Sequence, residues 1–319
     1  MDWPNLVYSD WVETYRTIHL WTQIVGKVRL CHEPWVNHSW GATLYVSSRG
    51  LTTSAIPYGE KLLTLEFDFI DHLLSIRTSE GHSATLPLNN DPISNFYNQL
   101  TKILEAFEIR SFFEPKPNEL SESISFSQDF RPRIYFPEQA HNFWQILIRV
   151  NNVLKDFRAQ FVGKCSPVHF FWGGFDLAVT RFSGRRAPMH PGHITHLPDR
   201  VAREAYSHEV SSCGFWPGNN LYPHAAFYSY AYPEPIGFST AGVASSSAFY
   251  HPTLREFILP YKDVRKSDDP SKELLRFLQS TYEATATLGL WNRDLLEESP
   301  FRSLCENEKS RLSPSATKD

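Results

Sequence analysis

The sequence lacks any excess of basic charge. Its 319 residues include 31 Lys and Arg against 35 Asp and Glu, which gives a formal net charge of −4 at pH 7. Proteins that bind nucleic acids normally present a basic surface to the phosphates, so this balance disfavours a nucleic-acid partner. Long apolar runs are also missing. No stretch approaches the roughly 20 apolar residues of a membrane-spanning helix, so we expect no membrane partner.

Paired cysteines and a secretory signal are missing as well. No CxxC or other paired spacing links the four cysteines, which are Cys31, Cys165, Cys213 and Cys305. The first residues, MDWPNLVYSDW, contain neither the basic segment nor the apolar core of a signal peptide. Together these absences predict a cytoplasmic protein with reduced thiols.

The strong catalytic motifs are absent from the sequence. It contains no P-loop, no GxGxxG after a strand, no HExxH and no GxSxG. This disfavours nucleotide-dependent enzymes, zincins and α/β-hydrolases, but it leaves open a site built from scattered residues. Aromatic residues, by contrast, are abundant at 14%. Such a content is typical either of a core rich in rings or of an aromatic-lined pocket.

Short segments recur in the two halves of the chain. Residues 23–27 (QIVGK) reappear at 160–164 (QFVGK), and a Trp-Gly pair follows each of them, at 40–41 and 172–173. Recurrence in a fixed order indicates internal duplication. We therefore predict an α+β fold of two helix–antiparallel sheet–helix units, related by a pseudo-twofold axis, with their helices on one sheet face.

The predicted boundaries follow from this repeat. The first α+β repeat covers 1–110, and the second covers 138–296 with an insert at about 185–226. Residues 111–137 are rich in proline and serine and have no sustained period, so they are predicted to connect the halves. The polar tail, 297–319, is expected to be disordered.

Local patterns predict several elements. Apolar residues recur at helical spacing from Trp11 to Val25, and Gly26 is placed to end that helix. Pro137 is placed at the start of another helix. Alternation from residue 175 to 181 predicts a strand with Asp176 on one face and Arg181 on the other.

Histidines concentrate in the second half, where seven of the thirteen lie between residues 169 and 251. Imidazole titrates near neutral pH and binds iron, copper or zinc. We therefore predict catalytic roles for His169, His208 and Asp176, and transition-metal ligation by His169, His208 and His38. Neighbours on a strand point to opposite faces, so His208 and Glu209 cannot share one ion. The alternative is that these histidines are loop and core residues held by hydrogen bonds.

Arginines close to this region suggest recognition of an anion. Arg181 and Arg185 flank a Ser-Gly pair at a strand end, and guanidinium groups bind carboxylates or phosphates through two hydrogen bonds. We predict that both bind the substrate. The alternative is that they form ordinary ion pairs with Asp176 and Glu209.

Tyrosines form the last candidate set. Tyr228 and Tyr230 alternate along a predicted strand that ends near Glu234, so these three side chains are predicted to line a ligand face. The alternative is simple packing on an edge strand that proline ends. Cys213 has no identifiable orienting group for a nucleophile, and a small buried thiol is the expected interpretation.

Long strings of the sequence resemble a known family. They cover residues 19–30, 44–59, 66–72, 166–188, 205–218 and 277–284. They are similar to a family of bacterial and fungal proteins catalogued only as a domain of unknown function, over about residues 3–291. The resemblance implies no activity. It implies that the following residues lie in family motifs: His19, His38, His169, Asp176, Arg181, Arg185, His208, Glu209 and Glu234.

Two hypotheses of different classes follow. The first is an enzyme that acts on a small anionic or polar metabolite at a histidine and carboxylate site in the second repeat, with or without a transition metal. The second is a non-catalytic small-molecule-binding protein that uses the same pocket, with arginines and tyrosines as its contacts.

Overall fold

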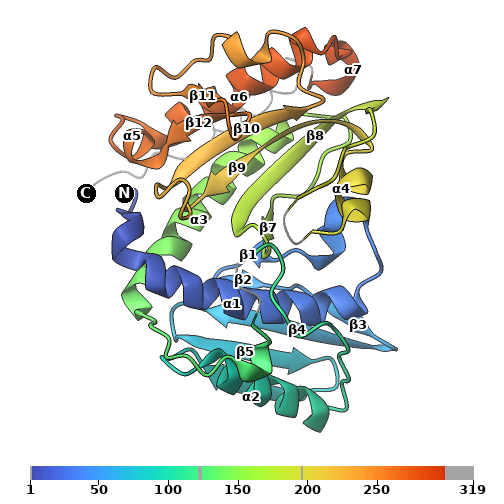
Figure 1. The fold of residues 1–319 in the computed structure, drawn as a ribbon, viewed down its shortest axis with the longest axis vertical. Helices are drawn as coiled ribbons and strands as arrows, with labels where there is room; N and C mark the ends of the chain where they lie inside the picture. Colours follow the sequence, from blue (N-terminus) through green and yellow to red (C-terminus); the bar gives the residue numbers. More distant parts are fainter. Residues whose placement is uncertain (1, 121–123, 195–196, 299–319) are drawn as a thin grey trace, which may run out of the picture.

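The fold combines helices with two antiparallel sheets, which places the protein in the predicted α+β class (Figure 1). The computed structural model describes residues 2–120, 124–194 and 197–298. Nearly all of the predicted tail lies outside these residues. No described helix is long and apolar enough to cross a membrane.

The first half runs from a long helix through a sheet to a second helix. The helices are α1 (Tyr8–His32) and α2 (Ile93–Ala106), and the short helix η1 (Asn37–Ala42) follows α1. The sheet has the strand order β1 (Tyr45–Val46), β2 (Gly50–Thr52), β4 (Lys61–Asp68), β5 (Leu73–Thr78) and β6 (Ser83–Pro87), with β3 (Ile56–Tyr58) also paired to β4.

The second half follows the same order of elements. It opens with α3 (Pro137–Ala159), where proline begins the helix as predicted, and it closes with α6 (Pro270–Leu288). The sheet has the strand order β11 (Phe249–His251), β12 (Glu256–Pro260), β10 (Ala226–Tyr232), β9 (His208–Trp216), β8 (Asp176–Arg186) and β7 (His169–Phe171). The short helices are η2 (Phe126–Gln128), α4 (Asp199–Ala205), η3 (Phe238–Thr240), α5 (Tyr261–Arg265) and α7 (Arg293–Leu296).

The two sheets meet at the edges formed by β1 and β7. Leu44 and Phe170 exchange backbone hydrogen bonds of 2.9 and 2.8 Å there. Each half therefore contributes a long helix, an antiparallel sheet and a closing helix. This order is compatible with a duplication but does not confirm it, so the pseudo-twofold relation stays a prediction. Strand β9 falls within the predicted insert and pairs with β8 and β10 in the interior of the second sheet.

Helices cover one face of the second sheet. Strand β8 alternates as its sequence predicts, so Leu177, Val179 and Arg181 face α3 and α6, and Asp176 and Thr180 point to the other side. The side facing the helices is mainly apolar and forms part of the core. The opposite face carries a small apolar cluster of Trp40, Phe182 and Val210 beside its polar side chains.

Gly26 does not end the first helix, which continues to His32. This corrects the expectation from the sequence. A Cβ atom added at Gly26 would lie 2.3 Å from Cδ1 of Trp172. The indole packs in this space and donates a hydrogen bond from Nε1 to the carbonyl oxygen of Ala42 at 2.7 Å. Glycine is thus present because a ring from the second half approaches the helix backbone.

Gly26→Ala is expected to destabilise the protein by about 1–3 kcal/mol, although alanine is the better helix former, because the added methyl group overlaps the Trp172 ring. Urea unfolding monitored by circular dichroism would measure the loss. Gly242→Ala is the control, since no atom lies within 4 Å of the position its Cβ would take. Equal stability of the two variants would contradict the explanation.

Candidate functional site

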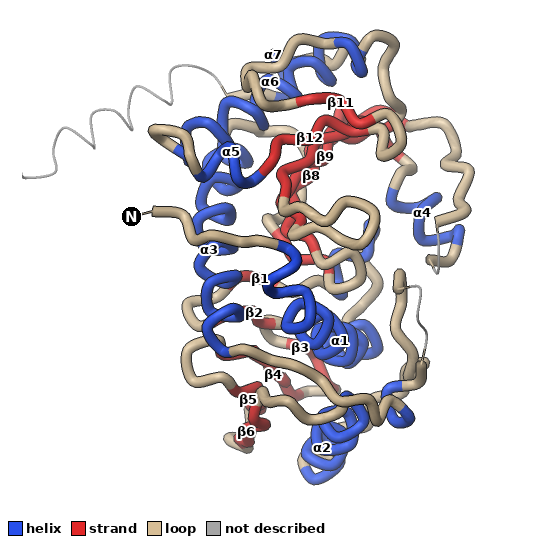
Figure 2. The backbone as a smooth tube through the Cα atoms, turned by 60° about the vertical axis from the view of Figure 1, so that its left-hand side comes forward, coloured by secondary structure: helices blue, strands red, loops and turns tan. Residues whose placement is uncertain are grey.

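The face of the second sheet that points away from α3 and α6 carries polar side chains from several strands. Residues paired across an antiparallel sheet point to the same side. Thr180 pairs with Ser212, which pairs with Tyr230. Two residues along the strands, and so on the same face, Gly214 pairs with Tyr228. Asp176 on β8 and Glu256 on β12 share this face by the same alternation. Helix α4 lies on this side of the sheet, opposite α3 (Figure 2).

A row of hydrogen-bonded and stacked tyrosines leads to Asp176. The hydroxyl group of Tyr228 donates a short hydrogen bond to Oδ2 of Asp176. The rings of Tyr228 and Tyr230 stack with centroids 6.1 Å apart. The hydroxyl oxygen of Tyr230 lies 2.9 Å from that of Tyr206, at the end of α4. One connected row therefore joins α4, β10 and β8.

Two glycines provide the space that these polar groups occupy. A Cβ atom at Gly214 would lie 2.7 Å from the hydroxyl oxygen of Tyr228, which crosses β9 on its way to β8. A Cβ atom at Gly173 would lie 2.0 Å from Oε1 of Glu119. The carboxylate of Glu119, from the segment that connects the halves, therefore lies directly over the turn that precedes β8.

We call these six side chains the acid–tyrosine cluster: Glu119, Asp176, Glu256, Tyr206, Tyr228 and Tyr230. Burial raises the pKa of Asp176 to about 6, although the hydrogen bond from Tyr228 acts in the opposite direction. Burial and the neighbouring charge of Asp176 raise the pKa of Glu256 to about 8 and that of Glu119 to about 7. Glu119 is exposed by surface area, so solvent screening weakens its shift. Acids perturbed together in this way are typical of functional sites.

Helix α1 fixes the turn and the connecting segment beneath the cluster. Nε2 of His19 donates to the carbonyl oxygen of Gly173 at 2.8 Å. Gln23 donates to the carbonyl oxygen of Asn118 at 3.0 Å and accepts from its backbone N–H at 2.9 Å. Burial lowers the pKa of His19 to about 4, so the ring stays neutral. His19 and Gln23 are therefore positioning residues for Glu119 and for the start of β8.

His169 lies on the sheet face that carries Asp176. It pairs with Ala178, two residues from Asp176 on β8, and points to the same face. The side chain is 0% exposed. Its Nδ1 lies 2.8 Å from the carbonyl oxygen of Pro167, which can only accept, so Nδ1 carries the proton. Nε2 is then an acceptor without a hydrogen-bond partner among the described residues.

His38 and His169 pack against the same indole ring. The ring centroids of His38 and His169 lie 5.1 and 6.0 Å from that of Trp40. Burial lowers their pKa values to about 4 and about 3, respectively, so both are neutral. No group of three His, Cys, Asp or Glu able to hold a metal ion occurs in the part of the chain that the structure describes. Metal ligation by His38, His169 and His208 stays a prediction.

His208 lies far from Asp176. It pairs with Arg186, whereas Leu177, the neighbour of Asp176, pairs with Phe215. The difference of seven residues along β9 (215 − 208) corresponds to about 24 Å. Of the predicted catalytic residues, His169 and Asp176 therefore share one face, whereas the strand register separates His208 from both.

The predicted substrate-binding charges are engaged in contacts within the fold. Arg181 is buried on the opposite face, between aromatic rings of α3 and α6. Arg185 forms an ion pair with Glu209 at 2.7 Å, which matches the ion-pair alternative. Glu234 pairs with Arg255 at 3.1 Å. Among the predicted contacts, Tyr228 and Tyr230 are the ones that the fold places beside Asp176.

Three members of the acid–tyrosine cluster were not predicted from the sequence. Glu119 lies in the connecting segment, where no periodic pattern indicates its orientation. Glu256 begins β12, and the pairing of β12 with β10 brings it to the cluster. Tyr206 follows α4 and joins the cluster through its hydroxyl contact with Tyr230. Cys213 is buried, and burial raises the pKa of its thiol to about 12, which agrees with the expected small buried thiol.

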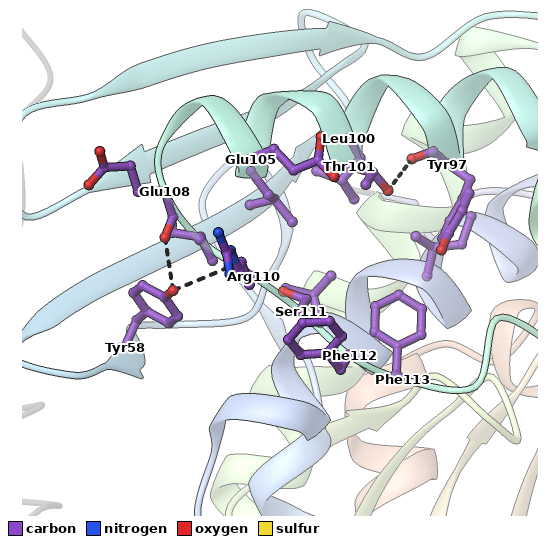
Figure 3. Close-up of a pocket in the computed structure, with 14 residues that line it drawn as sticks. Tyr58, Tyr97, Leu100, Thr101, Glu105, Glu108, Arg110, Ser111, Phe112 and Phe113 are labelled. Carbon is purple, nitrogen blue, oxygen red and sulfur yellow. Dashed lines mark hydrogen bonds between the residues drawn. The ribbon is translucent and has the colours of Figure 1, made fainter.

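A groove of about 910 Å³ lies in the first half, between α1, α2, β3 and residues 108–113 (Figure 3). The hydroxyl group of Tyr58 donates to the carbonyl oxygen of Glu108 at 2.8 Å and accepts from the N–H of Arg110 at 3.2 Å. Oγ of Ser111 lies 2.8 Å from Nε2 of His32. None of the site residues predicted from the sequence lines this groove. We therefore place the candidate site at the acid–tyrosine cluster.

Comparison with protein families gives one match. The model described as "Family of unknown function (DUF5996)" matches residues 3–298, nearly the whole chain. No curated protein and no solved structure matches the chain. The resemblance expected from the sequence is therefore confirmed at the level of the family.

Proposed function

The chain belongs to this family of unknown function, and we propose from its own geometry that it is an enzyme acting on a small polar molecule at the acid–tyrosine cluster. Asp176 acts as the general acid or base, and Tyr228 orients its carboxyl group. One observation carries the proposal: the Tyr228 hydroxyl group reaches Asp176 through the space left by Gly214. A side chain at position 214 would block this contact.

Two acids with different pKa values support proton transfer. A general acid or base works best when its pKa lies close to the working pH. With pKa values of about 6 and about 8, Asp176 and Glu256 differ in protonation near neutral pH. One can then accept a proton while the other donates.

His169 supports the same assignment. Its neutral ring keeps an unpartnered acceptor nitrogen on the face that carries Asp176. Because the Pro167 carbonyl group fixes the tautomer and burial keeps the ring neutral, this nitrogen can accept a hydrogen bond from a ligand without a rearrangement of the ring.

The cluster favours a polar substrate over an anionic one. Asp176, with a pKa of about 6, is ionised at neutral pH and would repel an anion. The arginines predicted to bind an anion are engaged elsewhere in the fold. We therefore propose a polar metabolite, and not an anion, as the substrate.

Non-catalytic binding is the second candidate. The stacked rings of Tyr228 and Tyr230 can hold a ligand without any chemistry, as tyrosines do in many binding sites. Turnover of a bound metabolite separates the two candidates, because a binding protein returns its ligand unchanged.

We also propose that the protein is cytoplasmic and that its partner is a small molecule and not a nucleic acid. Cys31, Cys165 and Cys213 are free thiols. Free thiols are typical of reducing compartments, and the net charge of −4 disfavours nucleic acid.

Tyr228→Phe is expected to slow turnover by about 10- to 100-fold, because Asp176 loses the hydrogen bond that orients it. The substrate is unidentified, so the assay incubates the protein with a metabolite extract and follows depletion and new products by mass spectrometry. Tyr250→Phe is the matched control, since its hydroxyl group binds Glu234 outside the cluster. Depletion that is equal in both variants would contradict the assignment. Retention of a metabolite without turnover would favour the binding alternative.

A further inference from the structure

The acid–tyrosine cluster has no basic counterpart. No Lys or Arg forms an ion pair with Glu119, Asp176 or Glu256 within residues 2–120, 124–194 and 197–298. Arg255, the chain neighbour of Glu256, turns to Glu234 at 3.1 Å. Lys27 donates to the side-chain oxygen of Asn118. The described chain therefore supplies no cation to balance Asp176, or to balance Glu119 and Glu256 when they ionise.

An unpartnered acceptor on the same face gives a second, independent observation. Nε2 of His169 is fully buried, keeps its lone pair and has no hydrogen-bond partner in the described part of the chain. The strand register directs the side chain to the face of Asp176. A buried acceptor of this kind requires a donor, which protein, water or ligand can supply. The sheet face that carries the cluster thus presents acceptors in excess of donors.

The tyrosine hydroxyl groups do not reverse this balance. The hydroxyl group of Tyr228 already donates to Asp176, and the single hydrogen bond between Tyr206 and Tyr230 leaves one hydroxyl proton of that pair against three carboxyl groups. The stacked rings of Tyr228 and Tyr230 add aromatic surface, which attracts cations. Carboxylates, an imidazole lone pair and aromatic faces all select a ligand that is positively charged and rich in N–H groups.

We propose that the molecule taken by the acid–tyrosine cluster is an organic cation with a protonated primary amine. The position of this binding site rests on the proposed function. An extended organic cation fits better than a metal ion, because no compact set of three ligands exists among the described residues. The carboxylates come from three separate segments, the connector, β8 and β12, so an extended ligand can contact more than one of them.

Isothermal titration calorimetry with three probes of the same chain length tests the charge. The probes are 1,4-diaminobutane, 1,4-butanediol and butanedioate, used with the full-length protein at pH 8.5, where Glu256 is mainly ionised and the amines are still protonated. We expect the diamine to bind at least tenfold more tightly than the neutral diol, and the dianion not to bind. Glu256→Gln is expected to weaken diamine binding at least tenfold. Glu60→Gln, an exposed acid outside the cluster, is expected to leave it unchanged.

Equal binding of the diol, or tighter binding of the dianion, would overturn the organic cation. So would diamine binding that Glu256→Gln does not weaken, or stoichiometric Zn²⁺ or Mn²⁺ binding that competes with the diamine. Absence of diamine binding while Tyr228→Phe still slows metabolite turnover would overturn the ligand class and leave the proposed function standing. Diamine binding without any turnover of the extract would retain the ligand class and contradict the enzyme. Thermal melts of each variant show whether it is folded.

Discussion

Asp176→Asn is expected to abolish turnover at the acid–tyrosine cluster and, at the same time, to make the protein more stable. Burial raises the pKa of the Asp176 carboxyl group from its ordinary 3.8 to about 6, so the ionised form is costly in the fold. Asparagine avoids this cost and can still accept the hydrogen bond from Tyr228 through its amide oxygen. A pKa rise of about two units corresponds to about 2–3 kcal/mol above pH 7.

The stability gain of Asp176→Asn is expected to increase with pH. A carboxyl group whose pKa is raised on folding stabilises the protein below its unfolded pKa, and this contribution is lost as the pH rises through the folded value. The stability difference between Asp176→Asn and the wild type should therefore be small at or below pH 4, grow between pH 4 and pH 6, and be fully developed above pH 7. Thermal melts at pH 4 and pH 8 measure it.

Asp268→Asn serves as the control, because this acid is exposed and lies outside the cluster. It is expected to change the melting temperature little at either pH. An Asp176→Asn variant that is less stable than the wild type at pH 8 would contradict the account, as would a difference that does not change between the two pH values.

Arg181→Ala is expected to lower the free energy of unfolding by about 3–5 kcal/mol, a large part of the 5–15 kcal/mol typical of a folded domain. The side chain is 1% exposed. Its guanidinium carbon lies 3.5 Å from the ring centroid of Phe157 and 4.3 Å from that of Tyr282. It also donates a hydrogen bond to the carbonyl oxygen of Phe157. Alanine leaves a cavity and removes that donor.

Two further variants separate packing from charge. Arg181→Met refills most of the volume and removes a buried charge whose pKa burial lowers to about 10, so it should lose less stability than alanine. Arg185→Ala, at the solvent-exposed ion pair with Glu209, should lose less than about 1 kcal/mol. Urea unfolding measures all three. If Arg181→Ala kept full stability but lost ligand binding, the sequence-based substrate role would be right and the structural role wrong.

The sequence predicted elements where one short pattern determines the result. Period-two alternation placed Asp176 and Arg181 on opposite faces of β8, and the structure agrees because that face preference is local. Pro137 begins α3 for the same reason. The prediction that Gly26 ends α1 is wrong, because the glycine makes room for the ring of Trp172, a residue distant in the chain.

The candidate site was less accessible to sequence analysis. His208 and Asp176 belong to one sheet, but register, which sequence spacing does not reveal, separates them. Glu119 and Glu256 join Asp176 only after the connecting segment folds over Gly173 and β12 pairs with β10. Tyr228 was predicted from alternation, but its contact with Asp176 depends on the missing side chain of Gly214.

Titration of the Asp176 carboxyl carbon by ¹³C NMR tests the central claim most directly, with Asp176→Asn used to assign the signal. The account predicts a midpoint close to pH 6 in the free protein and a clear decrease when 1,4-diaminobutane is added, because a bound cation stabilises the carboxylate. A midpoint near the ordinary value of about 4, unchanged by the diamine, would contradict it.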